Sequence, residues 1–253
     1  MTVLDDLLDS LHEDAPIHSI VVGAYWTLVC SRYGGLAATL RPDHTHGEAR
    51  VREVGRLHHK SARQLAEWSH SGNLLEASIG VAAINSLLEV DEKLAVEVNA
   101  VDVLIEHGRG KNVALVGHFP FISKLRPAVG QLWVIEQHPA ESEYPAEAAV
   151  DLIPRADVVA ITGSALINHT LDNLLALCHA DTLVMILGPS TPLSPALFTH
   201  GVTILSGARI VDEAAVLRTV MQGATFQQVE GVQLLTMAQG AMQAKWREAS
   251  YER

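Results

Sequence analysis

The chain has 253 residues, 48% of them hydrophobic, which is enough to bury the core of one large domain or two smaller ones. Its formal charge of -11 disfavours binding to nucleic acid or to an anionic membrane, because both would repel an acidic surface. Two cysteines without CxxC spacing exclude a disulfide framework, and neither an apolar run of roughly 20 residues nor a signal peptide is found. We therefore expect a soluble, cytoplasmic protein whose partner is a small molecule, a metal ion or another protein.

The first part of the chain, residues 1–95, has the pattern of a small α+β domain. Residues 1–14 are typical of an acidic amphipathic helix. Residues 17–40 are rich in β-branched and apolar residues and are interrupted by glycines, which predicts a meander of short antiparallel strands. Two helices are predicted next, over residues 61–70 and 74–89, and the second carries a stripe of small residues that allows close packing.

Two polar side chains of the second predicted helix, Glu76 and Asn85, are candidates for a site. On an apolar helix a carboxylate and an amide need partners, and a site between two domains would supply them. The other interpretation is that Glu76 faces water near the start of the helix, where a negative charge favours the helix dipole. The sequence does not decide between the two.

The second part, residues 96–253, has the pattern of a parallel sheet. Strand-like segments recur at 112–117, 131–136, 157–162, 182–187 and 202–206. Short apolar strands that alternate with helices are typical of a parallel sheet covered on both faces. The predicted fold class is therefore α/β, a small N-terminal α+β domain followed by a Rossmann-like parallel-sheet domain. The tail, residues 230–253, is predicted to be a last helix packed on the body.

Three loops that follow predicted strands are candidates for a ligand site, because the crevice of an open parallel sheet lies beyond the carboxyl ends of its strands. Each contains a glycine, which lets the backbone approach a bound group. The loops contain Gly117, His118 and Phe119, then Thr162, Gly163 and Ser164, and then Gly188, Pro189, Ser190 and Thr191. Ser164 is placed to cap the next helix, where an anion would bind, although an ordinary N-cap has the same pattern.

The loop after the first of these strands does not predict a dinucleotide site. The fingerprint G-x-G-x-x-G brings the backbone close to a pyrophosphate, whereas Phe119, Pro120 and Phe121 occupy this stretch. Glu136 ends the second strand, where a ribose-binding acid is expected. A normally bound NAD is therefore disfavoured, while a nucleoside or a smaller anion stays open.

Histidine is abundant, with 13 in the chain, so metal binding has to be weighed. His44 and His46 are two apart and, on an extended segment, would chelate one ion together with a third ligand. His118 is the best placed, on a strand-end loop, and His169 lies about one helical turn beyond Ser164. No H-E-x-x-H or G-x-S-x-G motif is present, so neither a zincin nor a serine hydrolase is expected.

At these same loops the sequence resembles the putative heavy-metal chelation family, a domain of unknown function. The matching stretches are residues 79–85, 116–121, 162–171 and 187–195, and the last of them is the most specific. The resemblance implies an N-terminal domain similar to that of enolase, a Rossmann-like second domain and a site in the cleft between them. It does not imply enolase activity, because the catalytic barrel of enolases has no counterpart in this chain.

Two hypotheses follow. The first is chelation of a transition or heavy metal, or binding of a metal chelate, in a cleft formed by His118, the 162–164 turn, Asn168, the 188–192 loop and Asn85. The alternative is an enzyme or sensor that binds a small anionic metabolite or a nucleotide-like ligand at the same loops, with Glu76 or His118 as acid–base group. The sequence leaves open whether there is catalysis, and a homodimer is compatible with the apolar helices.

Overall fold

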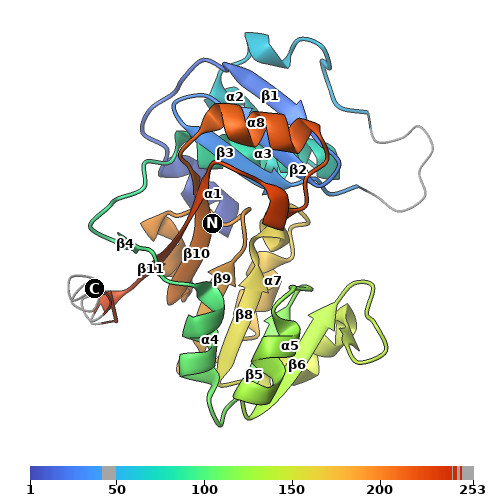
Figure 1. Cartoon of the computed structure of the whole chain (residues 1–253), viewed down its shortest axis with the longest axis vertical. Coiled ribbons are helices and arrows are strands. Elements are labelled where there is room, and N and C mark those ends of the chain that lie inside the picture. The colour runs from blue at the N-terminus through green and yellow to red at the C-terminus, as the bar shows by residue number, and fades with distance from the viewer. Residues whose placement is uncertain (42–49, 241, 244–245, 247–253) are drawn as a thin grey trace.

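The computed structural model describes residues 1–41, 50–240, 242–243 and 246. It contains a three-stranded antiparallel sheet and an eight-stranded, mostly parallel sheet (Figure 1). The predicted α/β class, with a small antiparallel sheet before a larger parallel one, is therefore confirmed. Within the described part, no helix is long and apolar enough to cross a membrane.

The N-terminal part is a meander covered by helices. Helix α1 (Val3–Asp9) begins with a capping box between Thr2 and Asp5, which satisfies free backbone N–H groups. The strands β1 (Ser19–Val22), β2 (Trp26–Cys30) and β3 (Gly34–Ala38) pair antiparallel in chain order, as predicted. The remaining elements of this part are the 3-10 turns η1 (Leu57–His59) and η2 (Glu67–His70) and the helices α2 (Ala62–Ala66) and α3 (Leu74–Leu87).

The large sheet contains the five predicted strands and three more. Its strands are β4 (Ala95–Val96), β5 (Asn112–Val116), β6 (Gln131–Glu136), β7 (Tyr144–Pro145), β8 (Val158–Thr162), β9 (Leu183–Leu187), β10 (Ile204–Ile210) and β11 (Val232–Ala238). Their order is β4-β11-β10-β9-β8-β5-β6-β7, and only β11 runs antiparallel to its neighbours. Strand β4 spans the boundary predicted between residues 95 and 96, which stays a prediction.

The predicted helix over residues 230–253 is wrong for residues 232–238. They form β11, which lies between β10 and β4. Leucine, methionine and alanine are good helix formers, so the local preference does not favour a strand here. Pairing with all seven residues of β10 supplies the hydrogen bonds that override it.

Further helices connect the strands of the large sheet. They are α4 (Ala100–Gly108), α5 (Ile122–Leu125), α6 (Ala149–Leu152), α7 (Leu171–Ala176) and α8 (Glu213–Met221), with the 3-10 turns η3 (Arg126–Ala128), η4 (Ala146–Ala148), η5 (Ile153–Arg155), η6 (Gly163–Leu166), η7 (Pro195–His200) and η8 (Phe226–Gln228). Helix α8 connects β10 and β11 of the large sheet, but it packs over the three-stranded sheet (Figure 1). Its Val216 and Val220 share a core with Leu28 and Leu36 of that sheet.

The strand order places a switch point beside β5. Chain connections lead from β5 to β6 on one side, and the later strand β8 pairs with β5 on the other side. At such a point the two connections diverge and leave a crevice beyond the carboxyl ends of the strands, where ligands of open α/β sheets bind.

Candidate functional site

A cavity of about 460 Å³ lies at this switch point. Apolar side chains, including Leu174 and Leu177, form much of its wall. Its polar lining includes His118, Glu136, Thr162, Ser164, Asn168 and Thr170, which come from the ends of β5, β6 and β8 and from the segment after β8. The volume lies within the range of about 300–1,000 Å³ that is usual for small-molecule sites.

Gly117 allows the loop after β5 to reach this cavity. Its φ of 110° lies in the region that L side chains rarely adopt, and an added Cβ would lie 3.0 Å from the Cβ of Thr162. Gly163 fills a similar role one strand away, because a Cβ there would lie 2.6 Å from the backbone nitrogen of Thr191. Glycine at both positions lets the three predicted loops pack side by side.

The helix cap predicted at Ser164 is wrong. The turn after β8 is the four-residue 3-10 helix η6, and its N-cap is Thr162, whose side chain accepts the N–H of Ser164. The left-handed backbone of His169, with φ of 58°, separates this turn from α7, which begins only at Leu171. A helix dipole for an anion is therefore not built at Ser164, although the hydroxyl groups of Thr162 and Ser164 lie 2.9 Å apart at the cavity wall.

His118 forms a close pair with Glu143. Its Nδ1 lies 2.7 Å from Oε1 of Glu143, whose side chain is only 5% exposed, whereas the side chain of His118 is 62% exposed. The backbone N–H of Ala140 lowers the pKa of Glu143, and with the bond from His118 it outweighs the opposing effect of burial. An ionised carboxylate only accepts hydrogen bonds, so Nδ1 carries a proton, and in the neutral form of the ring the lone pair is therefore on Nε2.

Sequence reasoning missed Glu143. It lies in the irregular segment between β6 and β7, and no motif or spacing marks it. Only the arrangement of the sheet brings this segment beside the loop after β5. A signal was present in the form of two acidic residues, Glu141 and Glu143, in a short loop beyond a strand end, but such residues are usually solvated.

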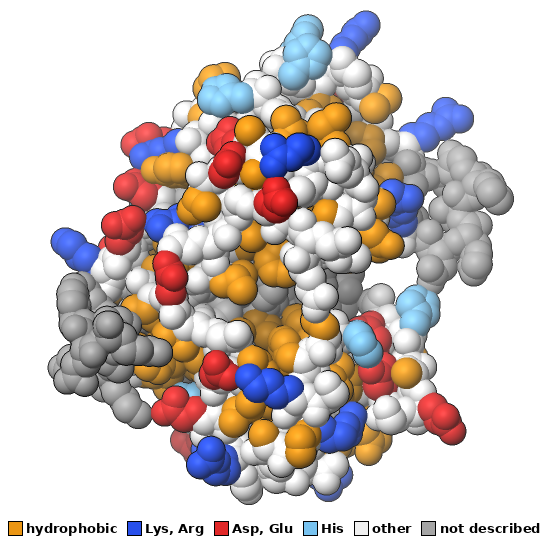
Figure 2. Space-filling model, in the orientation of Figure 1, with side chains coloured by type: hydrophobic (Ala, Val, Ile, Leu, Met, Phe, Trp, Pro, Cys, Tyr) orange, Lys and Arg blue, Asp and Glu red, His pale blue; other side chains and the backbone are white. Residues whose placement is uncertain are grey.

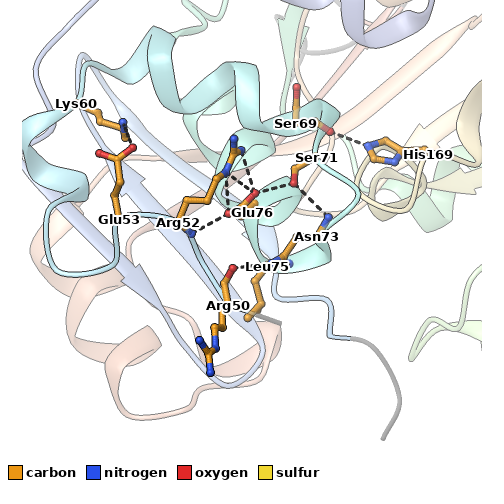
Figure 3. Close-up of polar contacts among 10 residues, drawn as sticks. All are labelled: Arg50, Arg52, Glu53, Lys60, Ser69, Ser71, Asn73, Leu75, Glu76 and His169. Carbon is orange, nitrogen blue, oxygen red and sulfur yellow. Dashed lines mark hydrogen bonds and ion pairs between the residues drawn. The ribbon is translucent and has the colours of Figure 1, made fainter. Parts of the chain in front are cut away.

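Within the described residues, no three or more His, Cys, Asp and Glu side chains lie close enough together to hold a metal ion. His44 and His46 lie outside the described residues. His169 donates from Nε2 to the backbone carbonyl of Ser69 at 2.7 Å, which ties the segment after β8 to the N-terminal part (Figure 3). Among the described histidines, His118 is the one that lines this cavity.

The third predicted loop and Asn85 join the two parts of the molecule. The N–H of Ala38 donates to Oγ of the buried Ser190 at 2.8 Å. Nδ2 of Asn85 donates to the carbonyl oxygens of Leu36 and Ser190. These side chains therefore hold the three-stranded sheet against the carboxyl edge of the large sheet.

The predicted single cleft is divided among three cavities. Gly117, His118, Glu136, Thr162, Ser164 and Asn168 line the cavity at the switch point. Asn85 and Thr191 line a second cavity of about 250 Å³, and Phe119, Gly188 and Pro189 line a third of about 370 Å³. The backbone of the loop after β9 packs directly on Gly163, and residues of this loop line the second and third cavities but not the first.

Glu76 lies outside all three cavities and is bound within the N-terminal part (Figure 3). Its carboxylate accepts the backbone N–H and the guanidinium Nε of Arg52 and the hydroxyl of Ser71. With only 3% of the residue exposed, the interpretation that it faces water is wrong. Burial raises its pKa, but the hydrogen bonds from Arg52 and Ser71 outweigh burial and leave the pKa below its ordinary value.

Comparison with known proteins identifies relatives over most of the chain. Two family models match, one at residues 99–238 and one at residues 4–88, and both are described as putative heavy-metal chelation. Among solved structures, a protein of unknown function from Desulfitobacterium hafniense DCB-2 superposes with a TM-score of 0.84 and 29% identity, covering 94% of this chain and 98% of that chain.

Two further proteins are similar to this chain at lower sequence identity. A protein of unknown function from Pyrococcus horikoshii has a TM-score of 0.79 at 18% identity, with the same coverage of 94% and 98%, which supports the fold alone. An uncharacterized protein of Methanocaldococcus jannaschii is 26% identical over 191 residues, 70% of each chain.

Proposed function

The chain belongs to the DUF364 family, described as putative heavy-metal chelation, and we propose that it binds a transition metal as a complex with a small organic molecule. The proposed site is the cavity beyond β5, β6 and β8, with Nε2 of His118 as the metal ligand from the protein. The organic molecule fills the rest of the cavity and the remaining coordination positions.

The pair of His118 and Glu143 is the observation that carries this proposal. Histidines that bind metals usually donate their other ring N–H to a carboxylate, which fixes the tautomer and the orientation of the ring. Glu143 accepts the Nδ1–H in this way, which leaves Nε2 of His118, a residue that lines the cavity, as the nitrogen for a metal. Imidazole suits zinc, copper, nickel and iron, so the donor type agrees with a transition metal.

The size and lining of the cavity support a chelate in preference to a bare ion. One imidazole does not complete the coordination of a transition metal, and the cavity of about 460 Å³ has room for an organic molecule. Hydroxyl groups of Thr162 and Ser164 and the amide of Asn168 suit the oxygen atoms of such a molecule. The apolar wall around Leu174 and Leu177 suits its carbon atoms.

Isothermal titration of the untagged protein with nickel nitrilotriacetate, a chelate with open coordination positions, tests the proposal. We expect binding at a ratio of one to one, and a loss of at least about tenfold in affinity in both His118→Ala and Glu143→Gln. His58→Ala, which removes an exposed histidine elsewhere, is the matched control and should bind like the wild type. Equal binding by His118→Ala and the wild type would contradict the proposal.

Glu136 favours a second candidate function, the binding of a nucleoside without metal. It ends β6 and lines the same cavity, at the position where an acidic side chain binds the ribose in many open α/β sheets. In the same calorimeter, adenosine binding that is lost in Glu136→Gln but kept in His118→Ala would favour this function. Chelate binding that depends on His118, with no adenosine binding, would favour the first.

A further inference from the structure

A separate apolar cavity lies across Phe119 from the proposed metal site. The Cε2 edge of this ring faces Gly117, which lines the metal cavity, and the Cε1 edge faces Gly188, which lines the cavity of about 370 Å³. Figure 2 shows hydrophobic side chains gathered in the middle of the face on which α4 and α5 lie. No charged side chain of the described residues lines this apolar cavity, so its chemistry differs from that of the His118 cavity.

The walls of this cavity suit a flat ring. Phe119 and Phe121 are half-buried and stacked, with ring centroids 5.1 Å apart and planes inclined by 21°. Phe226 contributes a third aromatic ring, and Gly188, with φ of 106°, leaves its side of the wall without a side chain. Aromatic side chains bind other rings by offset stacking and edge contacts, and the volume lies within the range of about 300–1,000 Å³ of small-molecule sites.

The hydroxyl group of Ser206, in the wall of this cavity, can act only as a hydrogen-bond acceptor for a ligand. The hydroxyl of Thr236 donates to the carbonyl of Val98 at 2.9 Å, which uses its only proton. The hydroxyl of Ser206, 2.5 Å from Oγ1 of Thr236, must therefore donate to Thr236. Because both protons are used, the oxygen of Ser206, in a residue that is 6% exposed, presents only acceptor capacity to a ligand.

We propose that this cavity, lined by Phe119, Phe121, Phe226, Gly188 and Ser206, binds a neutral, planar aromatic molecule with one hydrogen-bond donor on its edge. The aromatic walls take the faces and edges of the ring, and the oxygen of Ser206 accepts the N–H or O–H. The site is independent of the proposed metal function, since it shares no polar group with the His118 cavity.

A matched pair of probes tests the hydrogen bond. Indole and benzofuran have nearly the same shape, but benzofuran has a ring oxygen where indole has N–H. Titration followed by ligand-observed NMR should show indole binding at least about fivefold more tightly, because a site built for a donor rejects the analogue that lacks it. In Ser206→Ala the two probes should bind with nearly equal affinity.

A second pair of variants tests the location. Ala100 lines the cavity at the first position of α4, so Ala100→Leu places a larger side chain in it and should abolish indole binding. Ala214→Leu, an exposed change near the start of α8, is the control and should bind indole like the wild type. Thermal unfolding and nickel nitrilotriacetate binding by Ala100→Leu show whether the fold and the other cavity are intact. Absence of indole binding, equal binding of the two probes, or binding unchanged in Ala100→Leu would each overturn the proposal.

Discussion

His118 pairs with Glu143, and Glu76 pairs with Arg52. The two pairs differ in what the buried carboxylate does for its partner. At His118 the carboxylate of Glu143 is buried and the imidazole is exposed, so the ring is held in place while one nitrogen stays accessible. At Glu76 the carboxylate is buried and Arg52 covers it, so no oxygen is left for a ligand. The first arrangement is suited to binding and the second to stability.

We predict that Glu76→Gln lowers the free energy of unfolding at pH 7 by about 1–2 kcal/mol, since it weakens charged hydrogen bonds but leaves Arg52 free to turn to water. The folded pKa of Glu76 is below its ordinary value, so its contribution is complete above that value and is lost as the pH falls through the folded pKa. The difference between variant and wild type should therefore shrink with acidification, as measured by urea unfolding at pH 7 and in steps below pH 5.

Glu53→Gln is the control for this experiment. Glu53 pairs with Lys60 in the same region, but its side chain is 57% exposed (Figure 3). Its removal should change the free energy of unfolding by less than about 0.5 kcal/mol, as is usual at the surface. Equal losses in both variants, or a loss for Glu76→Gln that does not depend on pH, would show that the buried charge is not the cause.

Sequence reasoning identified His118 and Glu76 as candidates but missed the partner of each, Glu143 for His118 and Arg52 for Glu76. The position of His118 after an apolar strand is a local pattern, and local patterns can be identified along the chain. Glu143 and Arg52 become partners only through the fold, which brings the segment after β6 to His118 and the segment before α3 to Glu76. For Glu76 the sequence therefore supported two interpretations, neither of which included an arginine partner.

At the scale of elements, the small residues of α3 allow its backbone to lie directly against neighbouring elements. A Cβ added at Gly80 would collide with the backbone of Ser69 in η2, and one added at Gly35 would collide with the backbone of α3. The helix therefore packs at backbone contact against η2 on one side and β3 on the other. The sequence predicted this close packing from the small-residue stripe, because side-chain size is a local property.

We predict that Gly80→Ala destabilises the protein by about 1–3 kcal/mol, the usual cost of overpacking. The sign is diagnostic, since glycine in a helix interior otherwise costs about 0.5–1 kcal/mol relative to alanine. Gly72→Ala is the control, because nothing lies within 4 Å of its added Cβ. Chemical unfolding measures both, and a gain in stability for Gly80→Ala would mean that η2 moves aside at little cost.

Strand β11 could not be predicted from the local sequence pattern of its own residues. Residues 232–238 have a composition that suits a helix, and only pairing with β10 and β4 makes them a strand. Strands β5, β6, β8, β9 and β10 were predicted because each contains a short apolar run between turn signals, whereas the two-residue parallel strand β7 was not. An antiparallel strand added at the end of a parallel sheet depends on a neighbour rather than on its own pattern.

At the scale of the whole molecule, the two parts are interlocked through α8. This helix belongs to the C-terminal half in sequence, yet its Val216 and Val220 are buried on Leu28, Cys30 and Leu36 of the three-stranded sheet. Hydrogen bonds from Asn85 and Ala38 to the Ser190 region close the other side. A chain segment limited to residues 1–95 would expose the face that α8 covers.

We therefore predict that the two parts unfold as one unit and that Val216→Ala destabilises both. The truncation removes a fully buried side chain from between the sheet and α8 and should cost about 1–3 kcal/mol through lost burial and a cavity. Hydrogen exchange measured by mass spectrometry should show a similar loss of protection in the slowest-exchanging peptides of α3 and of β5 and β8. Val211→Ala, at a side chain that is 60% exposed, should change neither.

The same experiment separates coupling from mere proximity. If α8 only rests on the small sheet, Val216→Ala will lower protection in peptides of β2 and β3 and leave β5 and β8 unchanged, because sub-global opening of one part then precedes unfolding of the other. If instead the contacts of α8 and Ser190 couple the two parts, opening of the three-stranded sheet also breaks the hydrogen bonds of Ala38 and Asn85 to Ser190. The carboxyl edge of the large sheet then loses the part of the molecule that packs against it. The slowest exchange would then report one shared free energy in both sheets, and the cavity at the switch point would lose its shape only when the whole molecule unfolds.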